Sequence, residues 1–220
     1  MNVAEYIITR LKQAGLEHMF VVPGDYASPF IEVLDETPGV TRVANINELG
    51  SGYAADGYAR FKGIGAACVQ YGVGTFSLLN CTAGSFVERL PVAVISASPS
   101  TGDRKLEHTE RILFHHSTGD LRADQIVFQN VTVASEVIDN PERAPSQIDG
   151  AITAMLTHRR PIYIEVLQNV WTKDCVAPLG TLRPLNGVSD PQSLAAAVEA
   201  AAGLAGCSRF LPVYRRAMIR

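Results

Sequence analysis

The stretch Met19-Phe20-Val21-Val22-Pro23-Gly24 sets the pattern from which the fold of this 220-residue chain is predicted. Four apolar residues stopped by Pro-Gly are typical of a short strand buried on both faces of a sheet. Before it, apolar residues recur at helical spacing from Val3 to Ala14, and Gly15 stands where a helix C-cap is expected. The chain therefore opens with a helix followed by a buried strand.

The same alternation continues along the chain. Further strands are expected at 41–45, 65–71, 92–97, 131–134 and 161–166. Helices are expected at 29–35, 48–61, 75–89 and 141–158. This order predicts an α/β fold, a doubly wound and mostly parallel sheet flanked by helices. Ligands of such sheets bind outside the carboxyl ends of the strands, so the loops at 24–26, 45–48, 72–74 and 98–120 carry the candidate site.

Composition excludes several classes of function. A net charge of -3 provides no basic field for nucleic acid, which is not expected as a partner. No targeting segment or membrane-length apolar run is present, so a cytoplasmic location is expected, with no membrane partner. The cysteines are scattered without a Cys-x-x-Cys pair, which predicts reduced and mostly buried thiols rather than a zinc knuckle or disulfides. They are Cys68, Cys81, Cys175 and Cys207.

Two motifs could contact a ligand. Glu48 follows an expected strand and opens an expected helix; the alternative is a first-turn glutamate favoured only by the helix dipole. Gly72-Val73-Gly74 could be half of a dinucleotide fingerprint, but Ser77 occupies the third glycine position, which disfavours a nicotinamide site. Without a Cβ, this glycine pair would let a planar ring approach the backbone, or it could form a tight turn only.

Histidine and aspartate supply candidate proton-transfer groups. His115 and His116 lie in a polar loop, and histidine exchanges protons near neutral pH. Adjacent histidines point in different directions, so an idle exposed pair is a better alternative than a metal site, and no metal ligands are expected in this chain. Asp25 follows the first strand, the usual position of functional groups in this architecture, although an Asx-turn would also explain it.

Five motifs in order extend these observations to a family. They are Val22-Pro23-Gly24-Asp25-Tyr26, Asn47-Glu48-Leu49 with Tyr53 to Arg60, Tyr71-Gly72-Val73-Gly74, Ala83-Gly84-Ser85 and Leu113-Phe114-His115-His116. From about residue 2 to about residue 200 the chain resembles thiamine diphosphate-dependent 2-oxoacid decarboxylases, the family of pyruvate, indolepyruvate and phenylpyruvate decarboxylases. The resemblance implies a pyrimidine-binding domain at 1–167, a linker at 168–189, the first helix of an incomplete middle domain at 190–205 and an out-of-pattern tail at 206–220.

The resemblance also implies roles for the candidate residues. Glu48 would contact the aminopyrimidine ring of thiamine diphosphate and favour its imino tautomer. The expected cofactor-binding residues are Glu48, Gly24, Gly72, Val73 and Gly74, and the expected proton-transfer and positioning residues are Asp25, His115 and His116. The implied reaction is the non-oxidative decarboxylation of a pyruvate-type or aryl-pyruvate acid to an aldehyde. The histidine pair favours a decarboxylase over a carboligase of the acetolactate synthase kind.

The family's third domain binds the diphosphate and Mg²⁺ through a Gly-Asp-Gly motif, which this sequence does not contain. The chain alone is therefore expected to bind the cofactor weakly and to be inactive, needing a homo-oligomer or a separate diphosphate-binding chain. A truncated or frameshifted product is the leading expectation. The alternatives are the α subunit of a split enzyme, as in sulfopyruvate decarboxylases, and a non-catalytic binding or regulatory module.

Overall fold

A computed structural model describes residues 1–185 and 190–205. The strands are β1 (His18–Val21), β2 (Thr41–Ala44), β3 (Gly65–Gln70), β4 (Val92–Ser98), β5 (Ser135–Ile138) and β6 (Ile162–Leu167). The helices are α1 (Val3–Gln13), α2 (Ser28–Glu36), α3 (Glu48–Lys62), α4 (Val73–Ser77), α5 (Leu79–Val87), α6 (Thr101–Glu110), α7 (Ala123–Phe128), α8 (Ala144–His158) and α9 (Pro191–Ala205). Met1–Leu185 forms one compact unit, and α9 belongs to a second.

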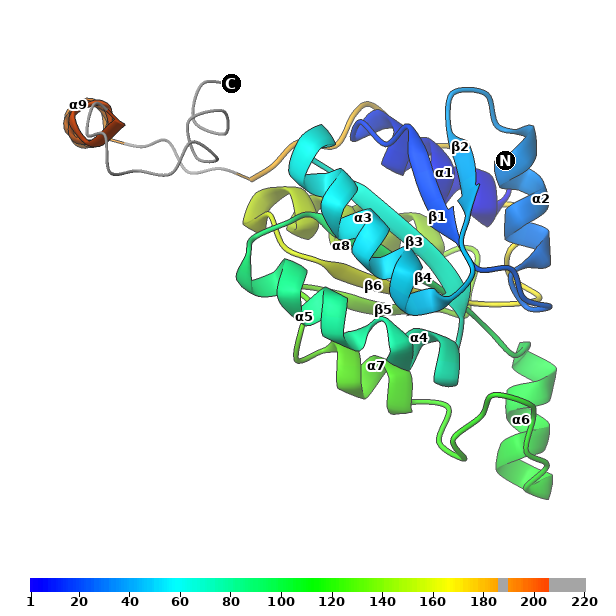
Figure 1. Ribbon diagram of the computed structural model, residues 1–220. Helices are drawn as coiled ribbons and strands as arrows, with labels where there is room; N and C mark the ends of the chain where they lie inside the picture. Colours follow the sequence, from blue (N-terminus) through cyan, green and yellow to red (C-terminus); the bar gives the residue numbers. More distant parts are fainter. Residues whose placement is uncertain (186–189, 206–220) are drawn as a thin grey trace. The chain divides into compact units, whose positions relative to one another are not determined.

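The strands form one parallel sheet in the order β2-β1-β3-β4-β6-β5, which confirms the predicted doubly wound α/β fold. Helices cover both faces, with α1, α2 and α8 on one and α3, α4, α5 and α7 on the other (Figure 1). Every residue of β3, β4 and β6 is buried, because these strands have neighbours on both sides and helices on both faces.

The first strand differs from its prediction. Met19 and Val21 are fully buried, but Phe20 between them is partly exposed. The neighbour of β1 on one side is the short edge strand β2, most of whose residues are exposed. Burial on both faces was therefore the wrong expectation, because this end of the sheet is covered less completely than its centre.

Two other predicted elements are wrong in their limits. The strand expected at 131–134 begins at Ser135 instead, because the turn after α7 continues to Val131 and the hydroxyl of Thr132 donates back to the carbonyl oxygen of Phe128 at 2.7 Å. The helix expected at 75–89 is two helices, α4 and α5, which meet at Leu78, where the N–H donates to the carbonyl oxygen of Thr75 at 2.8 Å.

The segment 98–120, expected to be a loop, contains the helix α6. Ser100 and Asp103 cap its start with reciprocal hydrogen bonds, and Glu107 is its buried residue. Figure 1 shows α6 set apart from the helices that cover the sheet. A charged helix with so small a buried face lacks the apolar periodicity by which helices are predicted.

The segment after β6 packs against the domain at Trp171, which is within the expected linker at 168–189. Trp171 is fully buried and packs against Phe30 with ring centroids 4.8 Å apart, and its indole N–H donates to the carbonyl oxygen of Tyr26 at 3.1 Å. Further along, α9 starts after Asp190, whose carboxylate accepts the Ser193 N–H at 2.8 Å, as its sequence predicted. The domain limits themselves, including the tail at 206–220 outside the described residues, stay predictions.

The thiols of the described residues are free. Cys68 and Cys81 are buried and Cys175 is partly buried, while Cys207 lies outside the described residues. Within residues 1–185 and 190–205, no helix is long and apolar enough to cross a membrane.

Candidate active site

The predicted site residues gather where the strand order of the sheet reverses. From β1 the chain first moves outward to β2 and then crosses back to β3, which pairs with the other side of β1. The carboxyl ends of β2, β1, β3 and β4 are consecutive along the sheet, and the segments that follow them carry Glu48, Asp25, Gly72 and His115 in that order. Such a switch point is where open α/β sheets bind ligands.

A turn that requires glycine follows β3. Gly72 has φ 65° and ψ −122°, and a Cβ on it would lie 2.9 Å from the carbonyl carbon of His116 and closer still to the oxygen. Its N–H donates to Oδ2 of Asp124 at 2.7 Å, and the Thr75 hydroxyl donates to the same oxygen. Asp124 is buried, and burial raises the pKa of its carboxyl above the ordinary value. This turn brings the histidine loop against the start of α4.

Glu48 and Gly74 form the second part of the site. The Asn47 side chain accepts the Gly50 N–H at 2.7 Å and caps α3, which fixes Glu48 as the first residue of that helix. Oε1 of Glu48 lies 3.5 Å from the position that a Cβ on Gly74 would occupy. Gly74 is buried and has no side chain, so nothing on it separates the partly exposed carboxylate from the backbone of α4, and the carboxylate can accept a hydrogen bond from a ring nitrogen. The residues present therefore fit an aminopyrimidine here.

The third part joins the loops after β1 and β4. Nε2 of His115 lies 3.8 Å from Oδ2 of Asp25 and 3.3 Å from the amide nitrogen of Gln70. The Tyr26 ring stacks on the imidazole with centroids 5.0 Å apart, and the Tyr71 hydroxyl donates to the His115 carbonyl oxygen at 2.7 Å. Burial raises the pKa of both tyrosine hydroxyls, so they remain protonated hydrogen-bond donors.

Three predicted residues have structural positions that the sequence did not indicate. A Cβ on Gly24 would lie 2.8 Å from Cδ of Gln70, so Gly24 makes room for the glutamine side chain. His116 has φ 70°, and its ring lies edge-on to that of His115 with centroids 5.0 Å apart. The half-exposed side chain of Val73 stands between the two glycines of its turn. Cofactor contacts by Gly24, Gly72, Val73 and Gly74 stay predictions.

Sequence reasoning missed two residues of this region. Gln70 is the last residue of β3 and Asp124 lies in α7, and each contacts loops distant in sequence. A polar residue that ends an otherwise apolar strand was a signal for Gln70. Nothing in the sequence distinguished Asp124 from a solvated charge, because its partners Gly72 and Thr75 are some fifty positions away.

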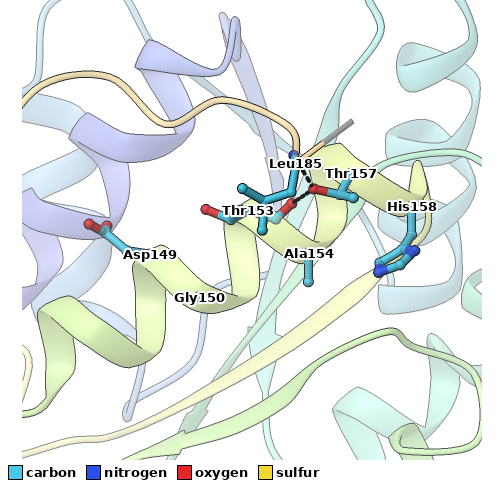
Figure 2. Close-up of a pocket in the computed structure, with 7 residues that line it drawn as sticks. All are labelled: Asp149, Gly150, Thr153, Ala154, Thr157, His158 and Leu185. Atoms are coloured by element: carbon cyan, nitrogen blue, oxygen red, sulfur yellow. Dashed lines mark hydrogen bonds between the residues drawn. The ribbon is translucent and has the colours of Figure 1, made fainter. Parts of the chain in front are cut away.

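The site is an open surface. The side chains of Asp25 and His115 are 85% and 52% exposed. A groove of about 350 Å³ lies elsewhere, along α8 (Figure 2), where the Leu185 N–H donates to the Thr157 hydroxyl at 2.8 Å. Its lining residues are Asp149, Gly150, Thr153, Ala154, Thr157, His158 and Leu185. In the described ranges, no three His, Cys, Asp or Glu side chains are grouped to hold a metal ion.

A glycine turn, a carboxylate and histidines at the switch point of a parallel sheet define a cofactor-binding α/β domain. Residues 1–125 match the family described as thiamine pyrophosphate enzyme, N-terminal TPP binding domain. Because this match covers more than half of the chain, the chain belongs to that family. The family indicated by the sequence motifs is thereby confirmed.

Curated relatives include decarboxylases from fungi and bacteria. A probable pyruvate decarboxylase of Schizosaccharomyces pombe is 36% identical over 93% of this chain and 36% of its own length. A pyruvate decarboxylase of Neurospora crassa is 37% identical over 91% of this chain and 34% of its own length. The indole-3-pyruvate decarboxylase of Azospirillum brasilense is 36% identical over 82% of this chain and 32% of its own length. The chain thus spans about a third of the length of the curated relatives it matches.

Proposed function

We propose that this chain supplies the pyrimidine-side half of the active site of a thiamine diphosphate-dependent 2-oxoacid decarboxylase. The observation that carries the proposal is the Glu48 carboxylate next to Gly74, with Oε1 3.5 Å from the position that a Cβ on this glycine would occupy. A carboxylate at that place can hold a proton at a nitrogen of a ring lying against the glycine. Family membership and the decarboxylase relatives support thiamine diphosphate as the ligand.

When bound, thiamine diphosphate supplies the electron sink that decarboxylation of a 2-oxoacid requires. The chain's own residues then divide the proton transfers. Glu48 holds a proton at a nitrogen of the pyrimidine ring. Asp25 and His115 lie together on the neighbouring loops, where they can position a 2-oxoacid and exchange protons with it. His116 adjoins this pair through its ring contact with His115.

The remaining half of the site, which holds the diphosphate and Mg²⁺, is proposed to come from another domain or another copy or chain. The exposure of Asp25 and His115 supports this proposal, because proton transfer on a 2-oxoacid needs a site from which water is largely excluded. A surface bearing backbone donors and a metal would offset the charge of the diphosphate and cover these side chains.

The segment after Asp25 does not define the size of the substrate. Ala27 and Phe30 in this segment are fully buried in the core of this domain. Tyr26 is also buried and presents its hydroxyl to His115 at 3.5 Å from Nδ1. We therefore propose a 2-oxoacid as the substrate class without a choice between pyruvate and aryl-pyruvates.

The test compares thiamine with thiamine diphosphate, which differ only in the group that this chain is not expected to hold. Both are titrated into the chain with Mg²⁺ while amide shifts are followed by NMR. If the chain provides only the pyrimidine side, both ligands bind weakly with similar affinity and shift the amides of Glu48 and Gly74. Glu48→Gln is expected to weaken both about tenfold or more, because a charge-assisted hydrogen bond is lost.

Glu142→Gln is the matched control, because Glu142 is exposed and lies before α8, outside the cluster. Its binding curves should match those of the unmodified chain. Shifts confined to residues away from Glu48 and Gly74, or no shift with either ligand, would contradict the proposed function. Much tighter binding of thiamine diphosphate than of thiamine would show that the chain itself holds the diphosphate.

A further inference from the structure

We propose that Gln70 is a positioning residue that holds His115 in the tautomer with its proton on Nδ1. The catalytic meaning of this inference rests on the proposed function, but the tautomer is a property of the chain alone. Gln70 is 7% exposed and ends β3 beside β1, where its side chain reaches both the loop after β1 and the histidine loop. No other side chain of the described site contacts both loops through its polar atoms.

The orientation of the Gln70 amide follows from its partner on the β1 loop. The backbone N–H of Tyr26 can only donate, so the atom that it contacts at 3.4 Å must be the amide oxygen Oε1. Gly24 keeps the side chain in place, because the glutamine fills the space that a Cβ there would need. The NH₂ end of the amide therefore faces His115.

The orientation of the amide determines which imidazole nitrogen carries the proton. An NH₂ group has no lone pair to offer, so Nε2 of His115, 3.3 Å away, must accept from it and be unprotonated. The proton of the neutral ring then lies on Nδ1, which faces the Tyr26 hydroxyl at 3.5 Å. That hydroxyl is free to accept, and the stacked Tyr26 ring holds the imidazole in plane.

The groups around His115 could favour a different proton position. Oδ2 of Asp25 is 3.8 Å from the same Nε2 and attracts a proton there, but its side chain is 85% exposed and screened by water. The His116 ring meets the imidazole edge-on, and the Tyr71 hydroxyl is engaged by the His115 backbone. Gln70 is nearer to Nε2 than Asp25 is, and it is buried, so its hydrogen bond determines the position of the ring proton. In this tautomer the Asp25 carboxylate receives no hydrogen bond from Nε2 of His115.

The test reads the tautomer directly from long-range ¹⁵N–¹H correlations of the histidine rings, at about pH 8, where histidine is ordinarily neutral. The unliganded chain is used, and His115→Gln identifies the His115 signals among the five histidines. The expected result is a His115 ring protonated on Nδ1. A ring protonated mainly on Nε2 in the unmodified chain would overturn the proposal without any variant.

Gln70→Glu gives the sharper comparison. A carboxylate of the same shape can still accept from Tyr26 N–H, but it cannot donate to His115, so the ring proton is expected to move to Nε2. Gln129→Glu makes the same chemical change at an exposed position of the turn after α7 and should leave the His115 pattern unchanged. An unchanged Nδ1–H pattern in a folded Gln70→Glu chain would also overturn the proposal.

Gln70→Met provides a second variant in case the added charge prevents folding. It keeps the length of the side chain and removes both hydrogen bonds, so the Nδ1–H preference should be lost while the amide spectrum stays native. Retention of that preference would contradict the role of Gln70. The ring spectra require no cofactor, so failure of thiamine to bind would count against the proposed function and not against this tautomer.

Discussion

Gly72 lies against the backbone carbonyl of His116, at a place where a Cβ would be 2.9 Å from the carbonyl carbon. The glycine turn after β3 and the histidine loop after β4 are therefore in direct main-chain contact. A positive φ of 65° at Gly72 adds a conformational requirement to this steric one. The position of the histidines thus depends on a residue that has no side chain.

Gly72→Ala is expected to lower the free energy of unfolding by about 1–3 kcal/mol, because the new methyl group must displace backbone and adopt an unfavourable φ/ψ. It should also displace the histidine loop, visible as shifted amide signals at 115–117. Urea denaturation measures the first effect. Gly84→Ala in α5 is the control: nothing lies within 4 Å of its Cβ position, and it should be neutral or stabilising by up to about 1 kcal/mol. Equal stability of the two variants would contradict this account.

Asp124 is expected to make the free energy of unfolding decline as pH rises above the ordinary pKa of an aspartate. Burial raises its folded pKa above the ordinary value of 3.8. In the pH window between 3.8 and this raised pKa, the folded chain binds more protons than the unfolded chain, so its contribution to stability declines as pH rises. Asp124→Asn can accept the same bonds from Gly72 and Thr75 through its amide oxygen and does not titrate. The variant should lose less stability than the unmodified chain as pH rises through this window.

The measurement is the difference in unfolding free energy between the two chains at several pH values through that window. Burial also raises the pKa of the nearby Glu165, and the Asp124 charge raises it further, so the difference reports Asp124 together with its effect on Glu165. Glu136→Gln on the edge strand β5 tests whether any loss of a carboxylate has this effect. A constant difference between the Asp124→Asn variant and the unmodified chain across the window would show that Asp124 does not titrate there.

The parts of the fold that the sequence predicted are those specified by local patterns. Apolar runs ended by turns located the buried strands of the sheet, and the Asp190-Pro191 pair located the start of α9. The helix α6 was missed because its residues face solvent and lack apolar periodicity. The strand at 131–134 was misplaced because Val131 has strand propensity but belongs to the turn after α7, where its N–H donates to the Phe128 carbonyl oxygen at 3.0 Å.

The site was predictable only in part, for a related reason. Glu48, Asp25 and the histidines follow strands, so the topology of a parallel sheet was enough to bring their loops to one edge. Gln70 and Asp124 act through contacts between segments 44 to 52 positions apart, which depend on three-dimensional packing. No local spacing in a single sequence contains that information.

The cysteines should differ in reactivity. Burial raises the pKa of Cys68 to about 12 and that of Cys81 to about 11, so thiolate is scarce at both positions. Cys175 is only partly buried and should react first of these three with iodoacetamide in the native chain. Peptide-resolved mass spectrometry separates the thiols. Modification of Cys68 as fast as Cys175 would contradict the described core; in urea all should react.

Arg10 joins α1 to α8 and to the segment that follows β6. Its guanidinium donates to both carboxylate oxygens of Asp149, at 2.8 and 2.7 Å, and to the Gly180 carbonyl oxygen at 2.8 Å, with a side chain that is 2% exposed. Arg10→Lys keeps the charge but not the planar set of donors, so the partly exposed Asp149 carboxylate and the Gly180 carbonyl oxygen lose hydrogen bonds from a buried side chain. The free energy of unfolding should fall by about 2 kcal/mol or more.

Arg42→Lys is the matched control, because Arg42 contacts Asp35 through a single exposed ion pair at 2.7 Å. Its effect on urea denaturation should stay within about 0.5 kcal/mol. The Arg10 variant should also release residues 179–180 from the domain, which hydrogen exchange or limited proteolysis near Gly180 detects. If both variants were equally stable, the network around Arg10 would contribute no more than a surface ion pair, and residues 179–180 would need another anchor, such as the Leu185 hydrogen bond to Thr157.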